Sequence, residues 1–111
     1  MLARLEAGKV YFGANGGRVY CLNESDGKLA WDFKVQKPEK GARKHFTVPV
    51  LHNSRLYIGG ADKNLYCLDA LNGNVIWQVN SDDWIRSSPL VDDKNIHFAT
   101  ISGKLYNVSH K

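Results

Sequence analysis

The sequence predicts an all-β fold made of β-propeller blades, and internal repetition carries this prediction. Residues 10–31 recur with the same spacing as residues 56–77, so that Trp31 and Trp77 lie 46 positions apart. A third, shorter copy at residues 96–109 follows the second at an offset of 40. A period of about 40 to 50 residues made of short alternating strands is typical of propeller blades, because one such unit cannot bury both of its faces alone.

The repeats divide the chain into two complete four-stranded blades and one partial blade. We expect the first blade at about residues 1–35, the second at about 46–79 and the partial third at about 88–111, all within one propeller segment. A closed propeller has typically about 4 to 8 blades. The chain is therefore expected to be a segment of a larger propeller, or to complete a ring from several copies.

Alternating apolar residues bounded by turn residues predict the strands of each blade. In the second repeat the strands are expected at residues 47–51, 55–59, 64–69 and 74–79. Gly60 is expected to supply the positive φ of the turn after the second strand, and Asn72-Gly73 is a strong hairpin signal before the fourth. The first repeat has Asp26-Gly27 at the position of Asn72-Gly73 and an inner strand at residues 2–6.

The third repeat begins at residues 88–91, where Pro89 aligns with Pro49 of the second. Proline lacks a backbone donor, which suits the innermost strand of a blade, because that strand is an edge. Few features of the sequence favour helices.

Composition and charge indicate a globular chain but name no partner. The 111 residues are 43% hydrophobic and 23% charged, with a net charge of +4. No apolar run is long enough to cross a membrane, and the first residues lack the features of a signal peptide. Because the chain is expected to be a fragment, its localisation stays open.

The two cysteines, Cys21 and Cys67, occupy equivalent positions in successive repeats. Stacked sheets lie about 10 Å apart, too far for a disulfide, so both are expected to be buried free thiols. The four histidines show no ligand spacing, and we expect no metal site.

Residues 67–77, CLDALNGNVIW, resemble the tryptophan-docking motif of the pyrroloquinoline-quinone-like (PQQ-like) propeller family. Cys67 stands for the usual alanine and Asn72 for the usual threonine. The motif positions that match are Asp69, Gly73 and Trp77, and Gly27 and Trp31 match in the first repeat. The resemblance implies that these tryptophans join adjacent blades, so we expect both in the core.

Two connections between blades are candidate binding surfaces. The first is basic, with Lys37, Lys40, Arg43 and Lys44 against a single Glu39. It is suited to a phosphate-bearing or acidic partner, or it is an ordinary solvated loop. No aromatic residues alternate with its lysines, which disfavours binding of single-stranded nucleic acid.

The second connection carries Trp84 and Arg86, a pair of residue types favoured in binding hot spots. Alternatively, Trp84 covers the interface between two blades. The neighbouring Asp82 and Asp83 are expected to stay hydrated, because adjacent acids lack the spacing of a calcium loop.

The sequence contains no catalytic constellation. We therefore expect a noncatalytic PQQ-like segment that acts as a rigid platform for a protein or ligand and needs no cofactor. The alternative is a fragment of a PQQ-dependent quinoprotein dehydrogenase, which the same resemblance admits. The expected partners are another protein, the remaining blades of a parent protein, or further copies joined through exposed blade faces.

Overall fold

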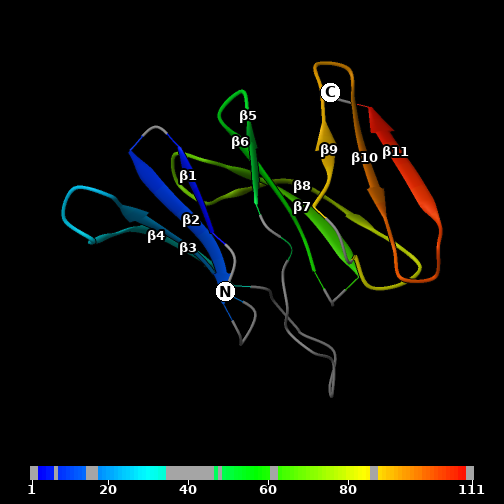
Figure 1. The fold of residues 1–111 in the computed structure, drawn as a ribbon, viewed down its shortest axis with the longest axis horizontal. Helices are drawn as coiled ribbons and strands as arrows, with labels where there is room; N and C mark the ends of the chain where they lie inside the picture. The colour runs from blue at the N-terminus through cyan, green and yellow to red at the C-terminus, as the bar shows by residue number, and fades with distance from the viewer. Residues whose placement is uncertain are drawn as a thin grey trace.

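The computed structural model describes residues 3–6, 8–14, 18–34, 47, 49–60, 63–85 and 88–109. These residues form three antiparallel sheets that stand side by side as blades (Figure 1). Blades 1 and 2 have four strands each and blade 3 has three. The all-β propeller-blade prediction is confirmed, and no helix occurs in the described part of the chain.

The strands of each blade follow one another in space as they do in sequence. Blade 1 contains β1 (Ala3–Glu6), β2 (Lys9–Ala14), β3 (Arg18–Asn23) and β4 (Leu29–Lys34). Blade 2 contains β5 (Val50–His52), β6 (Arg55–Gly59), β7 (Asn64–Asp69) and β8 (Val75–Asn80). Blade 3 contains β9 (Leu90–Val91), β10 (Asn95–Ala99) and β11 (Leu105–Ser109).

Blades 1 and 2 repeat each other down to an irregularity in their pairing. Cys21 lies opposite Trp31 across β3 and β4, and Cys67 lies opposite Trp77 across β7 and β8. The register shifts directly after the cysteine in both blades, at Cys21/Leu22 and at Cys67/Leu68. The internal repeat therefore specifies strand register as well as strand order.

The inner strands are shorter than the sequence suggests. β5 begins only at Val50 and β9 only at Leu90, directly after Pro49 and Pro89. A proline has no backbone N–H to donate to a neighbouring strand, so each inner strand starts at the first residue after its proline.

The expectation that Gly60 supplies the positive φ of the turn after β6 is wrong. The left-handed residue in the described part of this turn is Lys63, with φ of 72°. The neighbouring Gly59 serves packing instead, because a Cβ on it would lie 2.4 Å from Cγ2 of Ile85.

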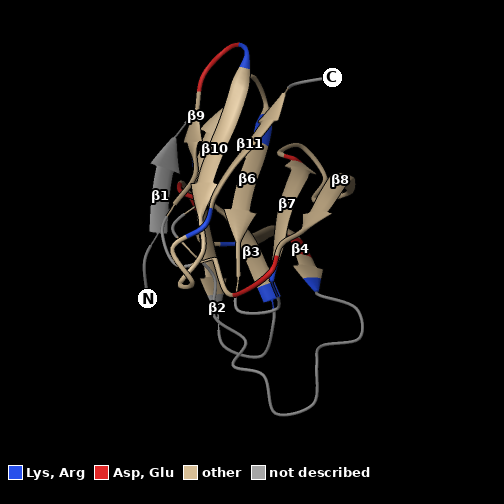
Figure 2. Cartoon of the chain, turned by 90° about the vertical axis from the view of Figure 1, so that its right-hand side faces the viewer, with Lys and Arg blue, Asp and Glu red and all other residues tan. Residues whose placement is uncertain are grey.

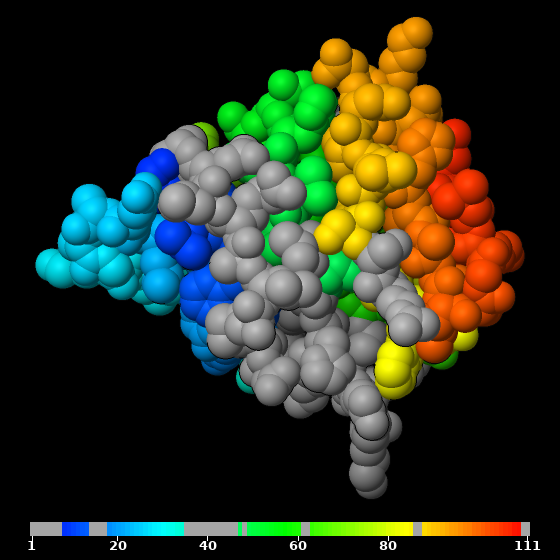
Figure 3. Space-filling view, viewed as in Figure 1, coloured from blue at the N-terminus to red at the C-terminus, as the bar shows by residue number. Residues whose placement is uncertain are grey.

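The core consists of two layers, one in each gap between blades. Between blades 1 and 2, Tyr11, Val19, Cys21 and Trp31 pack against Leu56, Ile58, Tyr66, Leu68 and Ala70. Between blades 2 and 3, the buried residues are Tyr57, Leu65, Cys67, Ile85, Ile96 and Phe98. Figure 3 shows blades 2 and 3 in contact on the face that it displays. Both cysteines are buried free thiols, as expected.

Each gap joins two different kinds of face. Each of blades 1 and 2 packs a tyrosine and a cysteine against the blade that follows it in the sequence. Blades 2 and 3 pack other apolar side chains against the blade that precedes them. Blade 3 departs from this rule, because His97 and Asn107 stand where blades 1 and 2 have tyrosine and cysteine. The last described face is therefore more polar than the two before it.

Trp31 fastens blade 1 to the hairpin turn of blade 2. The residue is 8% exposed, and its Nε1 donates a hydrogen bond of 2.8 Å to the carbonyl of Ala70. The ring also covers Gly73, where a Cβ would lie 2.4 Å from Trp31 Cε3. In the same turn, the backbone carbonyl of Asp69 accepts a hydrogen bond from Gly73 N at 2.8 Å. The side-chain Oδ1 of Asp69 accepts another from Leu71 N at 2.9 Å. These two hydrogen bonds hold the turn in place.

Trp77, expected in the core like Trp31, is only partly buried. By the offset of 40, the third-repeat positions equivalent to Ala70 and Gly73 are 110 and 113, and the chain has 111 residues. The 111 residues thus contain no counterpart of Gly73 for Trp77 to cover.

A matched pair of glycine variants tests this docking contact. Gly73 and Gly27 both have positive φ, 78° and 70°, but a Cβ on Gly27 would meet nothing within 4 Å. Gly27→Ala should cost about 1 to 2 kcal/mol of unfolding free energy, from backbone strain alone. Gly73→Ala should cost roughly 1 to 3 kcal/mol more, because Trp31 must move. Urea unfolding measures both, and equal losses would show that Trp31 does not depend on Gly73.

Candidate binding face

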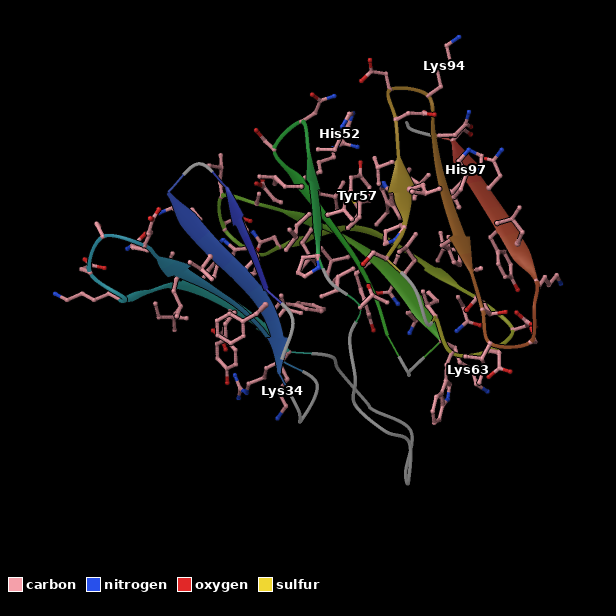
Figure 4. All side chains as sticks on the ribbon, viewed as in Figure 1. Lys34, His52, Tyr57, Lys63, Lys94 and His97 are labelled. Atoms are coloured by element: carbon pink, nitrogen blue, oxygen red, sulfur yellow. The ribbon has the colours of Figure 1, made fainter. Side chains whose placement is uncertain are left out.

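The connections between blades gather at one end of the molecule, which we call the connection end. Its described residues are Lys34, Thr47, Lys63, residues 81–85 and residues 100–104. Figure 4 shows Lys34 and Lys63 at this end, with His52 and Lys94 at the opposite end. Figure 2 shows charged residues mostly at strand ends and turns, with the strands between them largely uncharged. Charged residues of the described part are therefore concentrated at the two ends.

Most of the binding residues expected from the sequence lie outside the described residues. These are Lys37, Lys40, Arg43 and Lys44 of the first connection, and Arg86 of the second. The residues that flank the basic connection are described. Lys34 ends β4, and Thr47 joins the end of β6, where its N–H donates to the Gly59 carbonyl at 2.8 Å and its Oγ1 accepts from Gly59 N at 3.1 Å.

Trp84, the other expected binding residue, is described and is half-buried. It belongs to residues 81–85, which run from blade 2 to blade 3. Its carbonyl accepts a hydrogen bond from Ile101 N at 3.0 Å, and its own N–H donates to Asp83 Oδ1 at 2.8 Å. Its backbone is thus fixed, while part of its indole remains open to solvent.

The start and end of this segment are bound to blade 2. Ser81 N donates to the Lys63 carbonyl at 2.7 Å, and Ser81 Oγ lies 2.7 Å from the same oxygen. Ile85 N donates to the Gly60 carbonyl at 3.2 Å, and the Ile85 side chain is 4% exposed. Ile85 also forms a β-bridge with Thr100 of blade 3.

Asp82 binds the same segment to blade 3. Its Oδ1 accepts from the Tyr106 hydroxyl at 2.7 Å and from Thr100 Oγ1 at 3.2 Å, and its Oδ2 accepts from Ser102 Oγ at 2.7 Å. Its backbone N lies 2.9 Å from the Tyr106 oxygen. These hydrogen bonds, led by that from Ser102, lower the pKa of the Asp82 carboxyl below its ordinary value of 3.8.

The sequence expectation that Asp82 is simply hydrated is therefore incomplete. It is solvent-exposed, but its carboxylate also joins two blades. The partners lie 18 to 24 residues further along the chain, and no local pattern marks them.

The two thiols and Tyr57 between the blades are held in their protonated forms. Burial raises the pKa of the Cys21 and Cys67 thiols, which keeps them protonated at neutral pH. Burial, followed by the adjacent Cys67, raises the pKa of Tyr57 to about 12. Figure 4 shows Tyr57 in the gap between blades 2 and 3. In the described ranges, no three His, Cys, Asp or Glu residues lie close enough to hold a metal ion.

These blades, with tryptophan docking between them, define a repeat protein of the PQQ-like propeller class. The family model described as outer membrane protein assembly factor BamB matches residues 15–111, and the chain belongs to this family. No curated protein sequence matches the chain.

Solved structures show the same fold. BamB from Moraxella catarrhalis is 25% identical, with a TM-score of 0.81 over 96% of this chain. The computationally designed Ika4 protein is 15% identical, with a TM-score of 0.78 over 96% of this chain and 63% of its own. Sqt1 of Saccharomyces cerevisiae is 18% identical, with a TM-score of 0.80 over 93% of this chain and 27% of its own. This chain spans 36% of the Moraxella BamB, about a third of that protein.

None of the described segments forms a helix with the length and apolar character that a membrane crossing requires.

The lowered pKa of Asp82 makes a prediction about acid stability. A carboxylate with a depressed folded-state pKa stabilises the fold fully above its unfolded pKa, and this contribution is lost as pH falls through the folded-state value. Asp82→Asn should therefore lower the urea midpoint at neutral pH, and the gap from the parent protein should narrow as the pH falls below 3.8 and the Asp82 carboxyl of the parent becomes protonated.

Asp83→Asn is the matched control for this prediction. It removes the same charge from the adjacent position, and its amide oxygen can still accept the hydrogen bond from Trp84 N. Its midpoint should stay close to that of the parent at neutral pH. If both variants lost the same stability, net charge rather than the hydrogen bonds from blade 3 would explain the effect.

Proposed function

We propose that this chain is a noncatalytic propeller segment whose connection end binds a protein partner. The observation that carries the proposal is the placement of Trp84, a half-buried tryptophan on a segment whose backbone is bonded to blades 2 and 3. A large aromatic side chain on a rigid support contacts a partner at little entropic cost, and such residues dominate many interfaces. The family description, an assembly factor for outer membrane proteins, supports a protein as the partner.

The described residues of the connection end carry charges of both signs. Lys63 and Lys34 lie at this end of the molecule, and Asp82 and Asp83 lie on the same segment as Trp84. Charges around an aromatic anchor select a partner whose own charges are complementary to them.

Site-specific photo-crosslinking tests the proposal. A photoreactive phenylalanine at position 84 should crosslink one partner protein in the native host, and the same group at Leu29, which is 53% exposed on blade 1, should not. With that partner purified, Trp84→Ala should weaken binding by at least about tenfold, an effect of about 1.4 kcal/mol. Equal crosslinking from both positions, or unchanged affinity of the variant, would count against the connection end.

The dehydrogenase alternative is tested separately. Under the proposal, titration with pyrroloquinoline quinone gives no saturable binding in the micromolar range and no oxidation of alcohols or sugars. Micromolar binding or quinone-dependent turnover would replace the proposal with the alternative.

We also propose that isolated copies associate through the outer face of blade 1. Strand alternation places Val10, Phe12, Tyr20 and Leu22 on the face that points away from blade 2, and the Phe12 and Tyr20 rings lie 5.4 Å apart. Their repeat equivalents are Leu56, Ile58, Tyr66 and Leu68, which are all buried against blade 1. The outer face therefore has the composition of a blade interface.

Sedimentation at micromolar concentration checks this self-association. The parent chain should sediment as an oligomer, and Phe12→Glu should shift it toward the monomer, because burying an unpaired charge opposes association. Leu29→Glu adds the same charge at an exposed site and should leave the distribution unchanged. A monodisperse parent monomer that melts cooperatively would contradict the prediction.

A further inference from the structure

The hairpin turn that docks against Trp31 contains a reactive dipeptide, Asn72-Gly73. An asparagine followed by glycine is prone to spontaneous deamidation, because glycine has no Cβ to hinder attack of its backbone nitrogen on the asparagine side chain. Asn72 is exposed, and Gly73 is buried beneath the Trp31 ring. We propose that Asn72 is a deamidation site controlled by the docking of Trp31, and that isoaspartate at this position keeps the turn from docking again.

Deamidation proceeds through a cyclic imide and needs water as its only co-reactant. Gly73 N forms a bond to Cγ of Asn72, the Cγ–Nδ2 bond breaks, and the side-chain nitrogen leaves as ammonia. Water then adds to one of the two imide carbonyls. Breakage of the Cγ–N bond gives aspartate. Breakage of the bond between the nitrogen and the main-chain carbonyl carbon gives isoaspartate, in which Cβ and Cγ become part of the backbone.

The docked turn holds both reacting groups in other contacts. Gly73 N donates a hydrogen bond of 2.8 Å to the Asp69 carbonyl. Oδ1 of Asn72 accepts a hydrogen bond from Asn74 N at 2.9 Å. The nitrogen of a cyclic imide carries no hydrogen, so the hydrogen bond from Gly73 N cannot survive ring closure. The turn must therefore open locally before the imide forms.

Trp31 opposes this opening. Its ring packs directly on Gly73, where an added Cβ would lie 2.4 Å from Trp31 Cε3. The hydrogen bond from Nε1 to the Ala70 carbonyl keeps the ring in this place. The docked ring leaves no space for the peptide between Asn72 and Gly73 to rotate. Deamidation is therefore confined to molecules in which the contact between Trp31 and the turn has opened.

Blade 1 shows which product the turn accommodates. Asp26 occupies the position of Asn72, and its Oδ1 accepts a hydrogen bond of 2.9 Å from the backbone N two residues further on, as Asn72 Oδ1 does. Aspartate at position 72 therefore fits the same turn. Isoaspartate adds a methylene to the backbone of a turn that already touches Trp31, and this product has no room to dock.

This modification site goes beyond the proposed function and does not depend on it. The turn lies at the end of β7, whereas Lys63 and the connection end lie at its start. Asn72 also stands where the PQQ-like motif usually has threonine, which cannot deamidate. The chemistry is therefore a property of this chain and not of the motif.

A matched turn in blade 1 tests the control by Trp31. Asp26→Asn places the same dipeptide where no described atom lies within 4 Å of a Cβ on Gly27. Peptide mapping by mass spectrometry measures deamidation at both positions, separately from Asn15-Gly16, the other Asn-Gly pair of the sequence. Both rates are measured in the Phe12→Glu background, which is expected to keep copies apart.

The rates are measured in the folded chain and in guanidinium chloride, so that the effect of neighbouring residues in the sequence cancels. Folding should slow the reaction at Asn72 at least about tenfold more than at position 26. Equal slowing at the two positions would overturn the inference.

Tryptophan variants locate the control. Trp31→Phe removes the hydrogen bond to Ala70 and part of the ring over Gly73, so deamidation at Asn72 in the folded chain should become at least about threefold faster. Trp77→Phe makes the same change in blade 2 and should leave this rate as it is in the parent. Thermal melts establish that both variants are folded, and the comparison with Asp26→Asn requires no change at Trp31. An unchanged rate in folded Trp31→Phe would contradict the proposal.

The stability of the aged chain tests the second half of the proposal. Labelling by an isoaspartate methyltransferase quantifies isoaspartate, and peptide mapping assigns it to position 72. Molecules that carry it should have a lower urea midpoint than the fresh chain. Asn72→Asp represents the other product and should keep a midpoint close to that of the parent. An aged chain that retained the parent midpoint after isoaspartate had formed at position 72 would show that the modified turn still docks.

Discussion

The contact between Trp31 and the turn at Gly73 is the constraint on which the arrangement of blades depends. A tryptophan side chain buries about 150 to 250 Å², so this single residue covers much of the gap between two sheets. Its hydrogen bond to Ala70 fixes the direction of the ring, and its approach to Gly73 leaves no space for a Cβ. This contact therefore fixes the hairpin turn of blade 2 against blade 1, beside the other buried residues of the same layer.

Much of this architecture could be predicted from the sequence, because residues at the same position of two sequence repeats occupy the same position in two blades. The spacing between Trp31 and Trp77 predicted equivalent strands, and the structure places each opposite a cysteine with the same shift in register. The Asn72-Gly73 turn was also predictable, because its chemistry is local. The delayed start of β5 follows from Pro49, a local feature that the alternation of apolar residues does not take into account. The left-handed Lys63 was not anticipated, since its turn packs against residues 81–85, which are distant in sequence.

The candidate site was harder to predict than the fold, for a physical reason. Trp84 is marked by its residue type, but its support comes from atoms that are distant in sequence, such as the Tyr106 hydroxyl on Asp82. In the sequence alone, adjacent aspartates such as Asp82 and Asp83 are typical of a solvated turn. The role of Asp82 is evident only once β11 is placed beside it. Asp82 itself lies in the connection between two repeats, so the repeat pattern carries no information about its partners.

The two unlike faces of each blade give the assembly a direction. Because a face with a tyrosine and a cysteine meets a different, apolar face, the contacts are heterologous, and a chain of such contacts closes into a ring only if its rotations sum to a full turn. Otherwise the same contacts propagate into an open filament. His97 and Asn107 replace the tyrosine and cysteine on the last described face, which makes that face more polar than its counterparts on blades 1 and 2. If copies associate through their end faces as proposed, substitutions that made this face apolar would favour continued end-to-end growth.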